Sequence, residues 1–280
     1  MVIETSAQDC DGDKYKRELD LGMENNSLSL MFNHITENSV VLDVGCACGD
    51  LGVALKNIKY AEVYGLDYNQ DSVEMAKKTG AYKEVLRVDL DQINGESFPQ
   101  YRSKFDFIVC GDILEHLRNP KFVLNVLKLC LKQGGSIIAS IPNIAHMSIK
   151  ANLLLNNFDY TPTGLLDKTH IHFFTYKSIA ELLSSAGLTV DACDFTMFDK
   201  IGTQQNDPYP FLPNEIQKFL FKDYHSYVLQ YVIKMSISSN DNTALLEHNL
   251  SQVNLNEWTA PLYILNYRNQ ILRELFLSDL

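Results

Sequence analysis

The sequence predicts an α/β fold, a seven-stranded and mostly parallel sheet flanked by helices, with the last strand antiparallel. The first observation behind this prediction is an apolar run, residues 40–44, followed by a glycine-rich turn and a helix-like stretch. The second is a series of strand-like runs alternating with helix-like stretches, at 62–67, 84–91, 105–112, 136–141 and 188–195. A final run, 227–236, is predicted to pair antiparallel with the run before it.

The turn after the first strand has the residues of a ligand-binding loop. Gly45 and Gly49 remove side chains where the backbone must turn sharply and lie against a ligand. Asp50 is predicted to cap the helix that begins there, and Asp43, at the strand end, could accept a hydrogen bond from a cationic ligand group. The spacing is not the Gly-x-Gly-x-x-Gly that favours a pyrophosphate, so the turn alone leaves the nucleotide undecided.

The next strand ends in a carboxylate, Asp67, as a ribose-binding strand does. With this second motif the chain resembles the class I S-adenosylmethionine-dependent methyltransferases, which have a Rossmann-like sheet, over about residues 40–238. The resemblance implies S-adenosylmethionine as cofactor, with Asp67 accepting both ribose hydroxyls and Tyr68 lying against the adenine face. The family's middle glycine is Ala47 here, a small residue that is compatible with binding.

Further cofactor contacts follow from the same resemblance. Asp89 is expected to accept the adenine amino group and the backbone N–H of Leu90 to serve the ring, with Asp91 as the alternative acid. Gly111, at the end of the fourth strand, would let the backbone approach the sulfonium side of the cofactor. Tyr15 is a candidate contact, because a similar leader would lie across the cofactor mouth in related enzymes of polysaccharide gene clusters; a surface tyrosine on a packing helix is the alternative.

Three ionisable residues, Asp112, Glu115 and His116, crowd the loop after the fourth strand, where such sheets bind ligands. His116 could be the general base for a hydroxyl acceptor, or it could hold the loop. The order acid, acid, histidine also resembles ubiquinone-pathway O-methyltransferases, some of which use a divalent cation, so these three residues could hold Mg²⁺. We favour the metal-free interpretation, because the spacing is short and no fourth protein ligand is evident from the sequence.

Residues 142–175 resemble the acceptor-side wall of methyltransferases from bacterial polysaccharide gene clusters. This block adds His146, His170 and His172 to the candidate bases, and we rank His116 and His170 first and His146 third. His172 stands where the resemblance would place an arginine-like residue, which leaves its role open. The aromatic residues of the block could pack against the apolar face of a sugar or of a flat natural product; they are Phe158, Tyr160, Phe173 and Phe174.

The composition is that of an acidic globular protein. The 280 residues carry a net charge of −11, which argues against a nucleic-acid substrate because phosphate binding needs a basic surface. The six cysteines contain no zinc-type pair and are expected to be free thiols in a reducing cytoplasm. No apolar run is long enough to span a bilayer, and the N-terminus is polar rather than signal-like.

We expect three parts: a leader and helix over 1–38 that could form a cofactor lid, an S-adenosylmethionine-dependent methyltransferase domain over 39–238, and a helical extension over 239–280. The extension could cap the active site or form a homodimer contact. The predicted function is O-methylation of a small hydroxylated acceptor, a sugar or nucleotide sugar first and a secondary metabolite second. The alternatives are an N-methyltransferase of a small molecule or peptide, a nicotinamide-dependent oxidoreductase, and a non-catalytic S-adenosylmethionine-binding partner protein.

Overall fold

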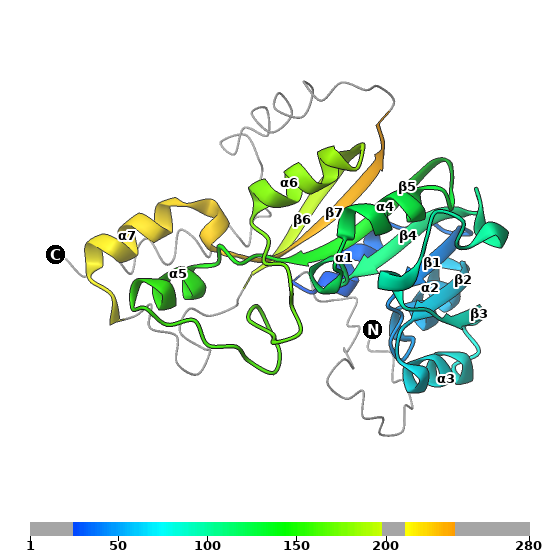
Figure 1. The fold of residues 1–280 in the computed structure, drawn as a ribbon, viewed down its shortest axis with the longest axis horizontal. Coiled ribbons are helices and arrows are strands. Elements are labelled where there is room, and N and C mark those ends of the chain that lie inside the picture. Colours follow the sequence, from blue (N-terminus) through cyan, green and yellow to red (C-terminus); the bar gives the residue numbers. More distant parts are fainter. Residues whose placement is uncertain (1–24, 198–210, 239–280) are drawn as a thin grey trace. The chain divides into compact units, whose positions relative to one another are not determined.

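The computed structural model describes residues 25–197 and 211–238, all within the first of the chain's two units, Met1–Ser239. Its strands are β1 Val40–Val44, β2 Glu62–Asp67, β3 Tyr82–Arg87, β4 Phe105–Gly111, β5 Leu131–Pro142, β6 Leu188–Met197 and β7 Val228–Ile237. They form one sheet in the order β3-β2-β1-β4-β5-β7-β6 (Figure 1). The pairs from β3 to β5 are parallel, whereas β7 is antiparallel to β5 and β6. The predicted fold class, a Rossmann-like sheet with its last strand antiparallel, is confirmed.

Helices connect these strands. The α-helices are α1 Ser27–Asn33, α2 Asp50–Lys59, α3 Gln70–Lys78, α4 Pro120–Lys128, α5 Met147–Leu154, α6 Tyr176–Ser185 and α7 Asn214–Lys222. Short 3₁₀-helices are η2 Leu90–Gln92, η3 Pro99–Tyr101, η4 Leu114–His116 and η6 Tyr224–Ser226. The prediction that Asp50 caps α2 is wrong, because Gly49 is the N-cap, in a left-handed conformation with φ 96°, and Asp50 is the first helical residue. A carboxylate there still favours the helix through the N-terminal dipole.

The core lies around the central strands. One apolar cluster joins five strands and two helices: Val41 of β1, Val63 of β2, Val109 of β4, Ile138 of β5 and Val232 of β7 pack with Met31 of α1 and Leu55 of α2. The strand order reverses between β1 and β4. In open α/β sheets, ligands bind in the crevice outside the carboxyl ends of the strands at such a reversal. The fold therefore puts the glycine turn after β1 and the loop after β4 at one crevice.

A buried asparagine joins the end of β5 to the start of β7. The Asn143 side chain donates hydrogen bonds to the carbonyl oxygens of His225 and Val228, at 2.8 Å each. Its backbone N–H donates to the carbonyl of Leu229 at 2.9 Å. Helices α5 and α7 lie beyond this end of β5 and β7 (Figure 1). The segment between β5 and α6, which contains the predicted acceptor-side block, is thus anchored to the antiparallel part of the sheet.

Some expectations fall outside the described residues. They are Tyr15, most of the leader 1–38, and the extension 239–280 with its proposed cap or homodimer contact. In the part of the chain that the structure describes, no helix is both long and apolar enough to cross a membrane.

Candidate active site

A cavity of about 990 Å³ opens at the carboxyl ends of β1, β2 and β4. The predicted cofactor residues that line it are Asp43, Gly45, Ala47, Gly49, Asp67, Tyr68, Asp89, Leu90 and Gly111. Two of the four candidate bases, His116 and His170, line the same cavity. Its volume lies at the upper end of the range of small-molecule sites, so a cofactor and a small acceptor fit together.

The turn after β1 is built on left-handed backbone. Gly45, Ala47 and Gly49 have φ values of 75°, 46° and 96°. A Cβ on Gly45 would lie 2.2 Å from Cδ1 of Ile113, so the turn packs directly against the loop after β4. Ala47 is the exception to the rule that such backbone favours glycine, and its conformation costs about 1–2 kcal/mol. The strained residue stays in place because its N–H is hydrogen-bonded.

The acceptor of that hydrogen bond is the carboxylate of Asp67, at the end of β2. One carboxylate oxygen accepts the N–H of Ala47 and the other accepts the N–H of Asn69, each at 2.8 Å. A carboxylate oxygen has room for two hydrogen bonds, so Asp67 can still accept two ribose hydroxyls. Tyr68 follows; 66% of the residue is exposed, and the guanidinium of Arg87 lies 5.8 Å from the ring centroid. Its open face is available for an aromatic base.

Two acids follow β3, and the structure distinguishes them. The strand ends at Arg87 rather than at residue 91, because Asp89 caps the short helix η2 by accepting the N–H of Asp91 at 3.0 Å. Asp91 also lines the cavity, but one of its carboxylate oxygens accepts the N–H of Arg118 at 2.9 Å. The other oxygen of Asp91 lies 3.8 Å from Nε of Arg118, so both of its carboxylate oxygens are tied to the loop before α4, which favours Asp89 as the adenine contact.

Asp43 is a buried acid with one partner that the sequence did not predict. Only 4% of the residue is exposed, and the hydroxyl of Tyr82 donates to its Oδ2 at 2.7 Å. Burial raises the pKa of Asp43 from 3.8 to about 7; the Tyr82 bond acts against this rise and the charge of Asp67 adds to it. A cationic group in the cavity would reverse the effect of burial, so Asp43 suits an ammonium group.

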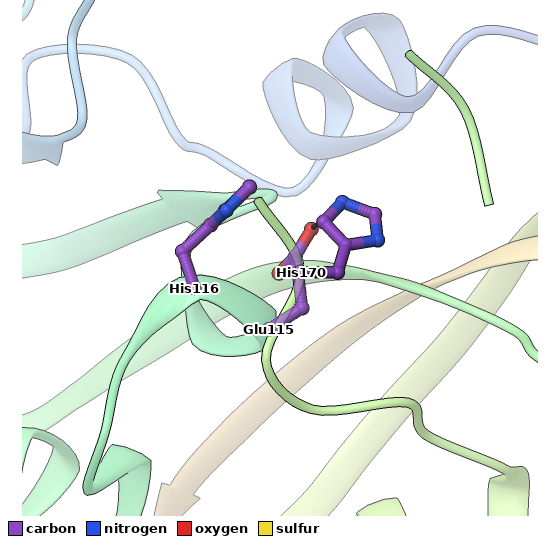
Figure 2. A group of neighbouring side chains, drawn as sticks. All are labelled: Glu115, His116 and His170. Carbon is purple, nitrogen blue, oxygen red and sulfur yellow. Dashed lines mark ion pairs between the residues drawn. The ribbon is translucent and has the colours of Figure 1, made fainter. Parts of the chain in front are cut away.

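Glu115, His116 and His170 meet at the cavity although two different segments supply them (Figure 2). The backbone carbonyl of Glu115 accepts the N–H groups of Ile171 and His172, at 2.9 and 3.0 Å. This places the imidazole of His170 4.8 Å from that of His116, measured between ring centroids. The Glu115 carboxylate is buried, with Oε1 3.9 Å from Nε2 of His170. One carboxylate and two imidazoles therefore form a compact group, in which potential ligand atoms all lie within 4.8 Å of one another.

Backbone carbonyls assign the tautomers of both histidines. Nδ1 of His116 lies 3.1 Å from the carbonyl oxygen of Thr169, and Nδ1 of His170 lies 3.2 Å from that of Leu165. A carbonyl only accepts, so each Nδ1 carries the hydrogen and each neutral ring keeps a lone pair on Nε2. Burial, helped by the neighbouring His116, lowers the pKa of His170. His170 is therefore neutral near pH 7, ready to accept a proton or to bind a cation.

The structure brings His170, rather than Asp112, to the two other residues that were considered as possible metal ligands, Glu115 and His116. Asp112 lines the cavity but is not part of the group that could hold an ion; His170 takes its place beside Glu115 and His116. The reason is that Oδ1 of Asp112 accepts the Ser140 hydroxyl at 2.5 Å and the Gln230 amide at 2.8 Å. The backbone of Asp112 is left-handed, with φ 53°. Two imidazoles and a carboxylate are a fitting donor set for a divalent cation.

His146, the third candidate base, is not among the residues that line the cavity. It is buried at the N-cap of α5, where Nδ1 accepts the N–H of Ser148 at 3.2 Å. Burial lowers the pKa of His146 to about 4. Its geometry is that of a helix cap.

His172 and the aromatic residues named for the block, Phe158, Tyr160, Phe173 and Phe174, also lie outside the cavity lining. His172 stacks on Phe174, and Phe158 packs edge-on against Tyr160 and Phe173. The wall of the cavity comes instead from Thr163, Gly164, Leu165, Asp167 and Thr169, with Leu28 and Met31 of α1 and with Pro142, Leu229 and Gln230 beside the β5–β7 pair. These residues, apolar and polar, belong to no motif, so no signal in the sequence marks them individually.

The family model and two curated relatives that match this chain are all described as methyltransferases. A family model described as a methyltransferase domain matches residues 15–192. The ubiquinone biosynthesis O-methyltransferase of Actinobacillus pleuropneumoniae serotype 5b (strain L20) is 33% identical over 150 residues, which are 51% of this chain and 62% of that protein. The protein of the same name from Pasteurella multocida (strain Pm70) is 30% identical over 177 residues, 59% of this chain and 69% of its own. The chain thus spans less than two thirds of the first of these relatives.

A solved structure of an S-adenosylmethionine-dependent methyltransferase from Methanosarcina mazei has the same fold. Its TM-score is 0.51 at 16% sequence identity, and the superposition covers 75% of this chain and 98% of that one. At this identity the likeness concerns the fold alone.

Proposed function

The chain belongs to the family of methyltransferase-domain proteins, and from this membership we propose that it transfers a methyl group from S-adenosylmethionine to an oxygen of a small hydroxylated acceptor. The observation that carries the proposal is the pair of imidazole Nε2 atoms, of His116 and His170, at a cavity that the expected cofactor residues also line. The names of the curated relatives support an oxygen acceptor over a nitrogen acceptor. The second candidate remains N-methylation of a small molecule or peptide.

The residues of the cavity fit the cofactor. The left-handed turn from Gly45 to Gly49 lines the cavity, and Asp67 and Asp89 offer acceptors close to the ends of neighbouring strands. Asp43 would face the cofactor's ammonium group. When bound, S-adenosylmethionine supplies a methyl group that its sulfonium already activates. The chain has to align the acceptor and exclude water, and orientation of this kind can supply about 7–11 kcal/mol of the barrier reduction.

A hydroxyl acceptor must also lose its proton. His170 is neutral near pH 7, because its pKa is lowered, and its Nε2 is available to take that proton. The buried carboxylate of Glu115, 3.9 Å away, would stabilise the imidazolium that results. His116 offers a second Nε2 beside it. The base is therefore one of these two histidines.

The same three residues, Glu115, His116 and His170, would hold a divalent cation if the protein uses one. Such an ion would acidify the acceptor hydroxyl. We favour the metal-free route, in which turnover is unchanged by a chelator. Loss of turnover with EDTA, and its return with added Mg²⁺, would establish the metal route instead.

The acceptor that fits best is a sugar or nucleotide sugar, with a secondary metabolite second. The acceptor side of the cavity presents hydroxyl, carboxylate and amide groups of Thr163, Thr169, Asp112 and Gln230, which suit a polyhydroxylated molecule. The net charge of −11 disfavours nucleic acid. The cysteines within the described residues are free, as expected for a protein of the reducing cytoplasm, which is the compartment that we propose.

Titration calorimetry with S-adenosylmethionine and, separately, with NAD tests the cofactor assignment. We expect binding of S-adenosylmethionine and none of NAD, because the turn lacks the Gly-x-Gly-x-x-Gly spacing. Binding of NAD alone would move the protein to the oxidoreductase alternative. Binding of S-adenosylmethionine without turnover on any acceptor would favour the non-catalytic partner alternative.

A further inference from the structure

The ring of Tyr82 fills a slot that glycines leave open. A Cβ on Gly52 would lie 2.2 Å from Cζ of this ring, and Cβ atoms on Gly49 and Gly65 would lie 3.0 and 3.1 Å from other ring atoms. Gly52 lies within α2 and Gly65 within β2, where glycine costs about 0.5–1 kcal/mol relative to alanine. A glycine inside such an element often marks a close approach by another group. Here the approaching group is Tyr82, which packs against the apolar clusters of both α2 and α3.

The hydroxyl group of Tyr82 contacts a residue that lines the cavity. Tyr82 Oη donates to Oδ2 of Asp43 at 2.7 Å. Asp43 lines the cavity, whereas Tyr82 is not among the lining residues, so the carboxylate stands between the phenol and the ligand space. Burial, and the nearby Asp43 charge, raise the pKa of Tyr82 well above 10.0, so its hydroxyl remains a donor.

Other ionisable groups face Asp43 from the neighbouring elements. They are the carboxylate of Asp67 on β2, the thiol of Cys46 in the turn and the thiol of Cys110 on β4. The Asp67 charge raises the pKa of Asp43, and burial raises the pKa values of both thiols, so they remain uncharged. Of these neighbours, Tyr82 is the one that stabilises the Asp43 carboxylate.

We propose that Tyr82 is a positioning residue for the cofactor: its hydroxyl, fixed by the glycine slot, holds the Asp43 carboxylate toward the ammonium group of the bound ligand. This inference rests on the proposed function, because it takes S-adenosylmethionine as the ligand. In this inference Gly52 and Gly65 make room for the Tyr82 ring and do not contact the ligand. It also makes cofactor binding pH-dependent, since a cation is best bound by ionised Asp43.

The test is Tyr82→Phe, which keeps the ring in its slot and removes only the hydroxyl. Calorimetry with S-adenosylmethionine from about pH 5.5 to about pH 8.5 should give an affinity about 5- to 10-fold lower near pH 7, as expected for one lost hydrogen bond. The midpoint of the pH dependence should rise by about half to one pH unit. Tyr101→Phe is the matched control: Tyr101 is buried and donates to the Glu84 carboxylate, but lies outside the cavity lining. It should leave affinity and midpoint unchanged.

Two further measurements distinguish a Tyr82 that positions Asp43 from a Tyr82 that only packs in the fold. In an Asp43→Asn background the added Tyr82→Phe change should have no further effect on affinity, because the two act as one unit. In the ligand-free protein, the carbon-13 signal of the Asp43 carboxyl should titrate at higher pH in Tyr82→Phe than in wild type. A wild-type protein that binds the cofactor while Tyr82→Phe keeps its affinity and midpoint would overturn the inference alone. A wild-type protein that does not bind S-adenosylmethionine would overturn the proposed function, and the inference with it.

Discussion

The carboxylate of Asp67 accepts the backbone N–H of Ala47, with an N–O distance of 2.8 Å. This bond ties the end of β2 to the turn after β1, where Ala47 has left-handed backbone. One side chain thus shapes the turn and, with its remaining hydrogen-bonding capacity, faces the ligand space. The turn after β1 and the proposed ribose-binding acid are therefore held in place by the same hydrogen bond, so a change in one should affect the other.

Asp67→Ala should weaken binding of S-adenosylmethionine by about 100-fold or more, because the ribose loses a charge-assisted bidentate partner and the turn loses its tie. Calorimetry measures the effect. Asp71→Ala is the control, since Asp71 is an exposed carboxylate at the start of α3 outside the cavity lining. Equal affinities for Asp67→Ala and the wild type would remove Asp67 from the site.

Ala47→Gly should raise the free energy of unfolding by about 0.5–1 kcal/mol, because removing the Cβ relieves left-handed strain that exceeds the entropic cost of glycine. Cofactor affinity should stay within a few-fold of wild type, since the N–H that bonds to Asp67 is kept. Urea unfolding and calorimetry check the two parts. A clear loss of stability would mean that the alanine methyl makes packing contacts worth more than the strain.

Asp43→Asn should make the protein more stable at neutral pH while weakening cofactor binding. The pKa of Asp43 is about 7 in the folded protein against an ordinary value of 3.8. The folded state therefore holds this proton more tightly, and wild-type stability falls as the pH rises from about 4 to about 7. Asparagine does not titrate, so the variant should gain up to about 4 kcal/mol relative to wild type across that window. Parallel stability curves for the two proteins between pH 4 and 8 would contradict the buried acid.

Replacement of His116 or His170 by alanine should lower turnover by about 10²- to 10⁴-fold for the variant that lacks the base, with little change in cofactor affinity. His146→Ala is the contrasting variant: it should cost about 1 kcal/mol of stability as a lost helix cap and leave turnover intact. Full turnover in both His116→Ala and His170→Ala would exclude both as the base.

The pH dependence of kcat/KM for the acceptor, measured at saturating S-adenosylmethionine, gives an independent view of the base, because saturation removes the pH dependence of cofactor binding through Asp43. Because burial lowers the pKa of His170 from 6.5, its neutral form persists into mildly acidic solution. If His170 is the base, the acid limb of the profile should therefore have its midpoint below pH 6.5. An acid limb above pH 6.5 would point away from His170.

The sequence predicted the parts of the site that are local in the chain. Asp43, Gly45 and Asp67 belong to strand ends and turns whose pattern is read within a few residues, and the parallel sheet brings such ends together. Tyr82 was missed because its contact with Asp43 depends on side-chain packing between β1 and β3, with β2 between them.

The pairing of His116 with His170 is a second feature that could not be predicted from the sequence. His116 was predicted from its loop, but its pairing with His170 depends on the hydrogen bonds that Glu115 makes to a segment more than fifty residues later. His146, which belongs to the same block as His170, instead caps α5, because a histidine ahead of a helix can satisfy a backbone N–H. The sequence pattern alone does not distinguish a histidine that lines the cavity, such as His170, from one that caps a helix, such as His146.

The most direct test of the central claim is transfer of a tritium-labelled methyl group from S-adenosylmethionine to a panel of sugar nucleotides, phenols, amines and peptides. We predict label on a hydroxylated acceptor, with a sugar nucleotide before a phenol, and loss of that label in Asp67→Ala. Label that reaches only amines or peptides would contradict O-methylation.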